Sequence, residues 1–285
     1  MLFIKKKSLG QHFLTSPAIA GKIADAAELT KKDTVLEVGP GNGILTKELL
    51  ARAGKVIAVE KDDRLIETLK EEFKKEVDSK KLILVHADAL DFDISKYLKK
   101  RNFIVVANIP YYITGSLLRK LLTTDNTQPT TMVLLVQKEV AERIVAKKEK
   151  PLDSARGKES LLSLSIKAYG VPHIVGVVKR GSFSPSPSVD SAILRIENIS
   201  KKNFTGLSEK HFFELLRAGF AHKRKFLLRN VGGIFGEKRV RGAFRACAIE
   251  EKARAENLPL EAWLALAYEL RHEAVYKGHV YTERT

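Results

Sequence analysis

Short apolar runs alternate with longer amphipathic stretches through roughly the first two hundred residues of the chain. The apolar runs are rich in β-branched residues and short enough for buried strands, whereas the stretches between them, such as DDRLIETLKEEFKKE, repeat apolar positions with the period of a helix. The predicted strands are VLEV from 35, KVIAVE from 55, LILVHAD from 82, FIVVANI from 103 and TMVLLVQ from 131. This alternation predicts repeated βα units around a parallel sheet, the α/β class.

Two further apolar runs, HIVGVV from 173 and SAILRIE from 191, lie on either side of a loop rich in serine and proline. We expect them to form a β-hairpin at the edge of the sheet. Near the N-terminus, Ser16 and Pro17 have the pattern of an N-cap and a first helical residue, which predicts a helix that runs to about Leu29.

Beyond Ile199 only helical periodicity is found. The polar segment KKNFTGL contains a helix-breaking glycine, and it is followed by SEKHFFELLRAGFAH, FLLRNVGGIFG, VRGAFRACA and LEAWLALAYELRHEAVY. We therefore predict a domain boundary near residue 202, with an α/β domain over residues 1–201 and a small, basic, all-α domain over residues 202–285.

The composition is that of a globular protein, with 44% hydrophobic residues among 285. No apolar run approaches the roughly 20 residues of a membrane helix, and the start MLFIKKKSLG lacks the apolar stretch of a secretory signal. We expect a cytoplasmic protein that does not interact with membranes. The single cysteine, Cys247, excludes an internal disulfide and a cysteine metal cluster.

Charge points to the partner. The chain carries 50 Lys plus Arg against 34 Asp plus Glu, a net charge of +16. This imbalance favours a polyanion, RNA or DNA ahead of an anionic membrane, although a basic surface kept for solubility is the alternative. The densest basic run is HKRKFLLR at 222–229. Such a run is usually a solvated helix face, but in a chain of this charge we expect it to contact nucleic acid.

The segment VLEVGPGNGILTKELL has the order strand, glycine turn, helix. Gly39 and Gly41 allow a tight turn and close approach to a ligand, although a turn without a ligand would contain the same glycines. About twenty residues further on, Glu60 ends the next predicted strand, where a carboxylate can accept hydrogen bonds from ribose hydroxyls. Together these features predict a nucleoside cofactor.

A dinucleotide would fit this spacing, but the pattern is Gly-x-Gly-x-Gly with Glu37 before it. The third strand ends in HADAL, so Asp88 can accept a hydrogen bond from the exocyclic amine of an adenine. Asp88 alone would more often be a helix cap or a surface turn. This set of strand-end acids resembles that of S-adenosyl-L-methionine-dependent methyltransferases, which implies a Rossmann-like class I sheet.

Asn108 is polar at the end of the apolar fourth strand, and the carboxyl ends of such strands line the binding crevice. Asn-Ile-Pro-Tyr at this position is the motif of methyltransferases that act on amino groups. The Asn108 side-chain oxygen and the Ile109 carbonyl can accept from the adenine amine and favour a more tetrahedral, more reactive nitrogen. Pro110 constrains the turn, and Tyr111 offers a stacking face. The alternative is a capped strand end with packed tyrosines.

With these motifs assembled, the chain resembles the ribosomal RNA adenine N6,N6-dimethyltransferases, the family of the bacterial small-subunit enzyme named for kasugamycin sensitivity and its eukaryotic relatives. The resemblance covers nearly the whole length. It rests on KKSLGQHFL, EVGPGNGILT, VEKD, HADAL, NIPYYITGSLL, VQKEVAERIVAK, FSPSPSVDSAILRI and FAHKRKFLLRN. The segment GKESLLSLSIKAYG departs from the family because it lacks a Tyr-Gly pair before Leu164, which leaves open the shape of the loop at 147–158 and its RNA contacts.

The resemblance implies roles for single residues. The implied cofactor-binding residues are His12, Leu14, Gly39, Gly41, Glu60, Asp88 and Asn108. Of these, His12 and Leu14 would close over the cofactor and Gly39 would line its amino-acid end. The implied catalytic residues are Asn108, Ile109, Pro110, Tyr111 and Phe183, with Phe183 stacking the target adenine opposite Tyr111. No metal is implied.

The predicted function is dimethylation of adenine N6 in small-subunit rRNA, at two adjacent adenines near the 3′ end, by a monomer that acts on the immature small subunit. One alternative is the sister family that methylates large-subunit rRNA and confers macrolide resistance, although LGQHFL and HKRKFLLRN favour the small-subunit group. Another is a non-catalytic assembly factor of the same fold. A nicotinamide dehydrogenase is disfavoured, because Asn-Ile-Pro-Tyr has no role in hydride transfer.

Overall fold

The computed structural model describes residues 12–98, 102–124, 127–146 and 158–271. The chain divides into two compact units, Met1–Lys202 and Asn203–Thr285. Apart from Lys158, the loop at 147–158 lies outside the described residues. Among the described residues, no helix is both long and apolar enough to cross a membrane.

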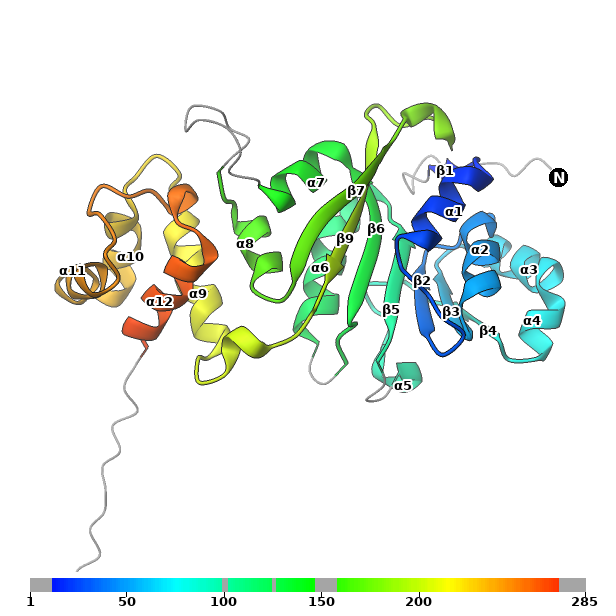
Figure 1. Ribbon diagram of the computed structural model, residues 1–285, viewed down its shortest axis with the longest axis horizontal. Helices are drawn as coiled ribbons and strands as arrows, with labels where there is room; N and C mark the ends of the chain where they lie inside the picture. The colour runs from blue at the N-terminus through cyan, green and yellow to red at the C-terminus, as the bar shows by residue number, and fades with distance from the viewer. Residues whose placement is uncertain (1–11, 99–101, 125–126, 147–157, 272–285) are drawn as a thin grey trace, which may run out of the picture. The chain divides into compact units, whose positions relative to one another are not determined.

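A seven-stranded sheet forms the centre of the first unit, in the order β4-β3-β2-β5-β6-β9-β7 (Figure 1). Neighbours from β4 to β6 are parallel, whereas β9 is antiparallel to β6 and to β7. The strands are β2 (Thr34–Val38), β3 (Lys55–Glu60), β4 (Leu82–His86), β5 (Ile104–Asn108), β6 (Thr131–Gln137), β7 (Val171–Val178) and β9 (Ser191–Glu197). The predicted Rossmann-like sheet with a terminal hairpin is confirmed. Of the two hairpin strands, β9 pairs with β6, and β7 forms the edge of the sheet.

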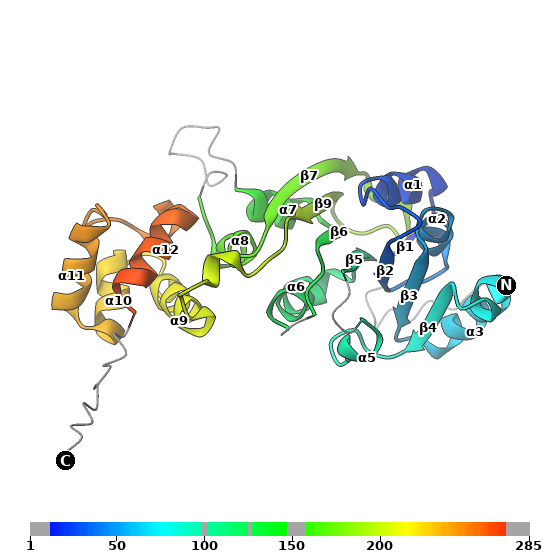
Figure 2. The same cartoon turned by 60° about the horizontal axis from the view of Figure 1, so that its bottom comes forward.

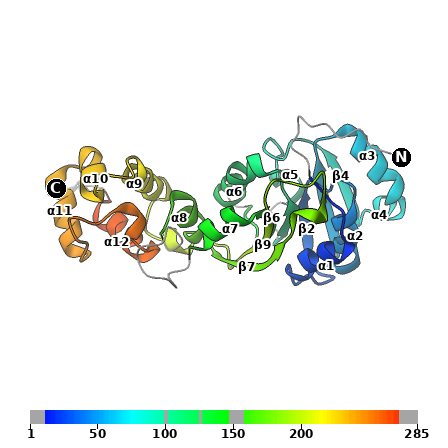
Figure 3. The same cartoon turned by 90° about the horizontal axis from the view of Figure 1, so that it is seen from above.

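The central strands are continuous apolar runs because helices cover both faces of the sheet. Residues 104–107 of β5 and 132–136 of β6 are buried. Helices α1 (Pro17–Asp25) and α2 (Ile44–Arg52) lie on one face and α6 (Thr114–Thr123) on the other (Figures 2 and 3). The carboxyl ends of the parallel strands therefore stay available for a site built from the connecting loops.

The first unit contains five further α-helices among its described residues. They are α3 (Asp63–Glu72), α4 (Lys74–Asp78), α5 (Ser95–Leu98), α7 (Lys138–Val145) and α8 (Leu161–Lys167), and a 3-10 turn, η2 (Tyr111–Ile113), leads into α6.

Helix α1 begins where the sequence predicts, and it ends earlier. The Ser16 hydroxyl caps its first turn by accepting from a backbone amide at 3.4 Å. The helix ends at Asp25 rather than near Leu29, because the chain turns and Glu28 adopts a left-handed φ of 51°. Residues 26–27 remain buried outside the helix, so the apolar pattern continues past its end.

A second, two-stranded sheet joins segments far apart in the sequence. Strand β1 (Phe13–Leu14) pairs antiparallel with β8 (Phe183–Ser184), which lies in the serine- and proline-rich loop of the hairpin. The Thr15 amide also donates to the Ser182 carbonyl at 2.9 Å. The N-terminal segment is therefore fixed against the hairpin loop.

The second unit contains four α-helices among its described residues, in agreement with the predicted all-α character. They are α9 (Glu209–Phe220), α10 (Leu227–Phe235), α11 (Glu237–Ala246) and α12 (Leu260–Glu269). Trp263 of α12 is fully buried, and its ring stacks on Phe220 with centroids 5.8 Å apart. A Cβ at Gly219 would lie 2.3 Å from the Trp263 ring, so the close contact between α9 and α12 requires glycine there.

The basic run at 222–229 lies mainly on a turn and not on a helix face. Residues 222–226 form the connection between α9 and α10, and all of them are exposed. Arg229, in the first turn of α10, is exposed as well. The run therefore presents its cationic side chains to solvent.

Candidate active site at the carboxyl ends of the strands

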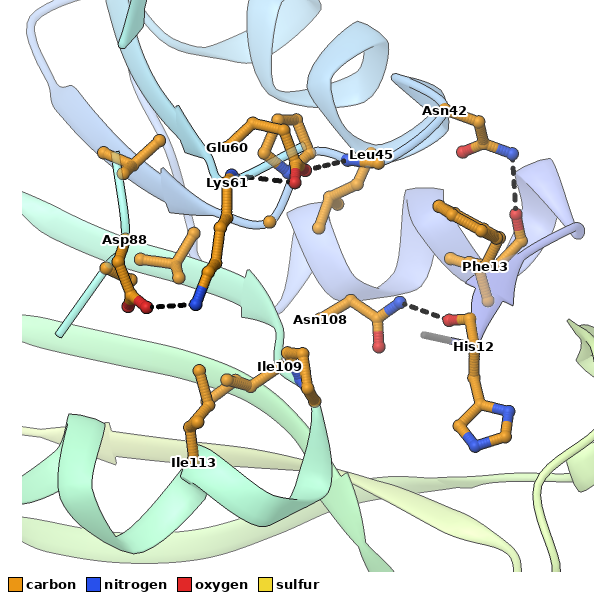
Figure 4. Close-up of a pocket in the computed structure, with 18 of the residues that line it drawn as sticks. His12, Phe13, Asn42, Leu45, Glu60, Lys61, Asp88, Asn108, Ile109 and Ile113 are labelled. Atoms are coloured by element: carbon orange, nitrogen blue, oxygen red, sulfur yellow. Dashed lines mark hydrogen bonds and ion pairs between the residues drawn. The ribbon is translucent and has the colours of Figure 1, made fainter. Parts of the chain in front are cut away.

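A pocket opens where the parallel strands end (Figure 4). Its lining residues come from five segments, 12–14, 38–45, 59–61, 87–90 and 108–113. These segments follow β2, β3, β4 and β5 in turn, together with the N-terminal strand β1. Every residue to which the sequence assigned a catalytic or cofactor-binding role lines this pocket except Phe183.

The glycine turn between β2 and α2 adopts left-handed conformations, with φ of 72°, 59° and 78° at Gly39, Gly41 and Gly43. A Cβ at Gly41 would lie 3.0 Å from the Phe13 ring, inside the pocket. A Cβ at Gly43 would lie 2.7 Å from Phe73, in the core beneath. Tight packing therefore accounts for Gly43, whereas Gly41 keeps the backbone open on the pocket side.

Glu60, at the end of β3, directs a largely buried carboxylate to the glycine turn. One oxygen accepts from the Gly41 amide at 3.2 Å, and the other accepts from the amides of Lys61 and Asp62 at 2.9 and 3.0 Å. Burial raises the pKa of Glu60, and these amides act in the opposite direction. Three of the roughly four acceptor positions of the carboxylate are therefore filled by backbone donors.

Asp88, beyond the end of β4, caps a turn and also lines the pocket. Its Oδ1 accepts from the Leu90 amide at 2.8 Å, as in a turn cap, while its Oδ2 accepts from the Lys61 ammonium at 2.7 Å inside the pocket. The bond from Lys61 and then that from Leu90 lower the pKa of Asp88. The carboxylate is ionised, oriented and still 27% exposed.

Asn108 is tied to the N-terminal segment. Its side-chain nitrogen donates to the His12 carbonyl at 3.2 Å, and Figure 4 shows its oxygen pointing away from His12. The Ile109 side chain is buried at 2% exposure, and Pro110 has φ of −56°. The bond that Asn108 donates to His12 therefore determines which end of the Asn108 amide faces the pocket.

Tyr111 lies beside Asn108 with both its hydroxyl and its ring in contact with other residues. The hydroxyl is 2.8 Å from the hydroxyl of buried Ser191 on β9, and the ring stacks on His12 with centroids 5.8 Å apart. Burial raises the pKa of Tyr111, and the bond with Ser191 opposes this. The next residue, Tyr112, is 65% exposed at the pocket mouth.

Phe183 is not part of the pocket wall. Its side chain is 5% exposed and belongs to the hydrophobic core cluster of the first unit. It pairs with Leu14 in the β1·β8 ladder, and the ring stacked on Tyr111 is that of His12. The structure therefore does not bring Phe183 and Tyr111 together around an open space.

Several contacts of the site were missed from the sequence. Lys61 pairs with Asp88, and Asn42 donates to the Leu14 carbonyl at 3.2 Å, which ties the glycine turn to β1. The motif letters VEKD and GPGNG contain these residues, but nothing in the spacing indicates where their side chains point.

Glu37 lies on β2 beneath the glycine turn and does not line the pocket. It is fully buried, and neither carboxylate oxygen has a hydrogen-bond partner. Burial raises the pKa of Glu37 to about 8; Thr46 lies close enough to lower it somewhat, although its hydroxyl is not in hydrogen-bond geometry. Glu37 is therefore mostly neutral at pH 7. Among the described residues, no group of His, Cys, Asp and Glu is arranged to hold a metal ion.

The fold and the pocket together define a class of protein. A Rossmann-like sheet with a glycine turn after β2, an acid at the end of β3 and Asn-Ile-Pro-Tyr after β5 is a class I S-adenosylmethionine-dependent methyltransferase. A model of the ribosomal RNA adenine dimethylase family matches residues 2–272. The chain belongs to this family, and it is an S-adenosylmethionine-dependent rRNA adenine dimethyltransferase.

Relatives agree with this assignment. The chain is 44% identical to a ribosomal RNA small subunit methyltransferase A of Dehalococcoides mccartyi, over 93% of this chain and 88% of the relative. It is 38% identical to one of Mycoplasmopsis pulmonis, over 93% and 99%, and 36% identical to one of Clostridium botulinum, over 90% of each.

Two solved structures share the fold over most of the chain. A dimethyladenosine transferase from Plasmodium falciparum has a TM-score of 0.72 and 28% identity, covering 90% of this chain and 97% of its own. The 23S rRNA methyltransferase ErmE has a TM-score of 0.70 and 26% identity, covering 90% and 99%.

Proposed function

We propose that this chain dimethylates adenine N6 in small-subunit rRNA, at two adjacent adenines near the 3′ end, and that it contributes to small-subunit assembly. The observation that carries the proposal is the loop 108–111, which lies at the mouth of a pocket that also contains Glu60 and Asp88. The choice of subunit is supported by the relatives from three bacteria, which are 36%, 38% and 44% identical and named as small-subunit methyltransferases.

The pocket residues fit the nucleoside half of S-adenosylmethionine. The fourth acceptor position of Glu60 is available to one ribose hydroxyl, and the second hydroxyl would replace the Gly41 amide, the longest of the three bonds at 3.2 Å. The Asp88 carboxylate accepts from the adenine amine beside Lys61. When bound, the cofactor supplies a methyl group on a positively charged sulfur.

The other end of the cofactor lies under the N-terminal segment in this proposal. His12 and Leu14 close the pocket, and Gly39 lines the amino-acid end. Asn42 and Asn108 both donate to backbone carbonyls of this segment, which supports closure as a property of the folded chain.

Activation of the target amine falls to the loop after β5. The Asn108 side-chain oxygen and the Ile109 carbonyl accept from the two N–H groups of adenine N6, and Pro110 constrains the turn that brings these acceptors together. Catalysis rests on orientation, and no residue acts as a general base. The hydrogen bond from Asn108 to His12 supports this role, because it turns the amide oxygen away from the N-terminal segment.

Tyr111 is the proposed stacking platform for the extracted adenine. Its ring is oriented by Ser191 and already stacks on His12. For Phe183 to stack the base on the opposite side, the β1·β8 pair has to open, because Phe183 is buried in that pair. We therefore propose that Phe183 acts only in the RNA-bound form.

RNA and the immature small ribosomal subunit are the proposed partners of the helical unit. The exposed basic run at 222–229 and the net charge of +16 support electrostatic contact with phosphates. Such contact carries affinity but no site specificity. A ribosomal substrate also supports a cytoplasmic location. The proposed monomeric state is checked by light scattering of the purified protein.

The test is transfer of labelled methyl from S-adenosylmethionine to undermethylated small and large ribosomal subunits, followed by nucleoside analysis. Dimethyladenosine confined to the small subunit is the expected result. Label on the large subunit would instead support the second candidate, a large-subunit enzyme. The structural similarity to the 23S rRNA methyltransferase ErmE is the observation that favours this candidate. Cofactor binding with no label on either subunit would point to an assembly factor that retains the fold.

A further inference from the structure

Lys120 reaches from α6 to the turn that follows β4. Its ammonium donates to the Leu90 carbonyl at 2.8 Å and to the Phe92 carbonyl at 2.6 Å. The side chain is partly buried, and this burial lowers the pKa of Lys120, against the nearby Asp91 and Asp93. A lysine in this position binds two carbonyls of one turn, which a neutral residue of the same length cannot do as strongly.

The turn that Lys120 binds forms one wall of the pocket. Asp88 and Leu90 both line the pocket, and Asp88 closes the turn by accepting from the Leu90 amide through its side chain. The Asp88 carbonyl accepts from the amides of Asp91 and Phe92 at 3.0 and 2.8 Å. Leu90 is thus fixed at its amide by Asp88 and at its carbonyl by Lys120.

Helix α6 carries Lys120 and directly continues the 3-10 turn η2, which contains Tyr111 and also lines the pocket. Lys120 therefore joins the element of the Asn-Ile-Pro-Tyr loop to the element of the strand-end acid. Lys120 itself does not line the pocket.

We propose that Lys120 is a positioning residue: it orients the 88–92 turn so that the Asp88 carboxylate selects a cofactor base with an exocyclic amine. This inference rests on the proposed role of Asp88 in adenine recognition. In this proposal Lys120 acts on the cofactor only through the turn, since it does not line the pocket. Without its ammonium, the Leu90 and Phe92 carbonyls lose a shared donor, and the turn no longer directs Asp88 to one place.

Calorimetry of the full-length protein with two ligands tests the inference. The ligands are S-adenosylhomocysteine and its inosine analogue, in which oxygen replaces the exocyclic amine. Lys120→Met keeps the apolar stem but removes the ammonium that binds the Leu90 and Phe92 carbonyls. We expect the preference for the adenine ligand to fall about tenfold in this variant, because the charge-assisted bonds that orient the turn are lost. Lys120→Arg retains two donors and should restore the preference to within about threefold.

The matched control is Arg119→Met, which removes a cation from the exposed side of the same helix and should leave the preference unchanged. Lys120→Gln, which retains a neutral donor, serves if the methionine variant does not fold, and should show an intermediate preference. Equal losses for both ligands in the Lys120 variants would overturn the inference, since that pattern describes a general structural defect. If the unmodified protein itself showed no preference, the proposed role of Asp88 would fail first, and this inference with it.

Discussion

The two ends of the Asn108 side-chain amide have different partners. The nitrogen binds His12, and the oxygen is the proposed acceptor for the target amine. The nitrogen donates to a backbone carbonyl at 3.2 Å, so the oxygen is the end left for the pocket. An acceptor aimed at the target amine is what the proposed chemistry needs, because N6 has two N–H groups and a delocalised lone pair. In the proposed mechanism, a polar residue at the end of an apolar strand thus makes one observed hydrogen bond as a donor and one proposed hydrogen bond as an acceptor.

Substitution of Asn108 by alanine removes both bonds. We expect Asn108→Ala to lower the rate of methyl transfer by about 10²–10³-fold, the usual effect of deleting one oriented polar group. RNA affinity should stay within about twofold, because phosphate contacts elsewhere supply most of it. Single-turnover transfer and filter binding measure the two quantities. Normal turnover in this variant would remove Asn108 from the mechanism.

Glu37 is a second residue whose environment sets its behaviour. Its folded pKa of about 8 lies above the ordinary value of 4.5. The neutral carboxyl is thus favoured in the folded chain, and its contribution to stability is full below pH 4.5 and is lost as pH rises to about 8. We expect the stability of Glu37→Gln relative to the natural chain to increase across that range, by several kcal/mol at about 1.4 kcal/mol per pKa unit.

Denaturant unfolding of both proteins between pH 5 and 9 gives the comparison. The change with pH is the informative quantity, since burying an amide adds a cost that does not depend on pH. Parallel stability curves would mean that Glu37 ionises in the folded state as it does in the unfolded chain.

At the scale of elements, periodicity was enough for the main sheet and failed for the small one. The strands β2 to β7 and β9 are five to eight residues long, and the apolar runs of the sequence predicted each of them. Strands β1 and β8 have two residues each and pair across the whole domain, so they leave no periodic signal. For the same reason the burial of Phe183 could not be predicted: an aromatic residue in a proline-rich loop has the same sequence whether it packs or stacks.

Strand-end residues could be predicted to converge because parallel strands end at one edge of the sheet. Glu60, Asp88 and Asn108 line one pocket for this reason. The contacts of Lys61, Asn42 and Lys120 depend on side-chain direction, which sequence spacing does not specify.

The contact between β1 and the glycine turn gives the prediction at this scale. A Cβ at Gly41 would lie 3.0 Å from the Phe13 ring, and φ is 59° there. We expect Gly41→Ala to weaken S-adenosylhomocysteine binding at least about tenfold, because strained backbone costs about 1–3 kcal/mol and β1 has to move. Gly242→Ala is the control, since nothing lies within 4 Å of a Cβ there. Unchanged calorimetric affinity in Gly41→Ala would show that β1 yields without disturbing the pocket.

At the scale of the molecule, the predicted catalytic pocket and the densest basic run lie in different units of the chain. The acids and the Asn-Ile-Pro-Tyr loop belong to Met1–Lys202, while the densest basic run belongs to Asn203–Thr285. Charge in the helical unit should therefore affect RNA affinity without affecting the cofactor pocket. The predicted boundary near residue 202 rests on the polar segment at 201–207, which separates two periodicities.

The double variant Lys223→Glu, Lys225→Glu tests this division. Both side chains are exposed, and replacing two cations should lower rRNA affinity about tenfold or more and reduce the salt slope by about two, as expected for two lost phosphate contacts. S-adenosylhomocysteine affinity should not change. The control variant Lys75→Glu, Lys96→Glu has the same change in net charge on exposed positions of the first unit. If both variants lowered RNA affinity equally, net charge would be the cause and the basic turn would have no particular role.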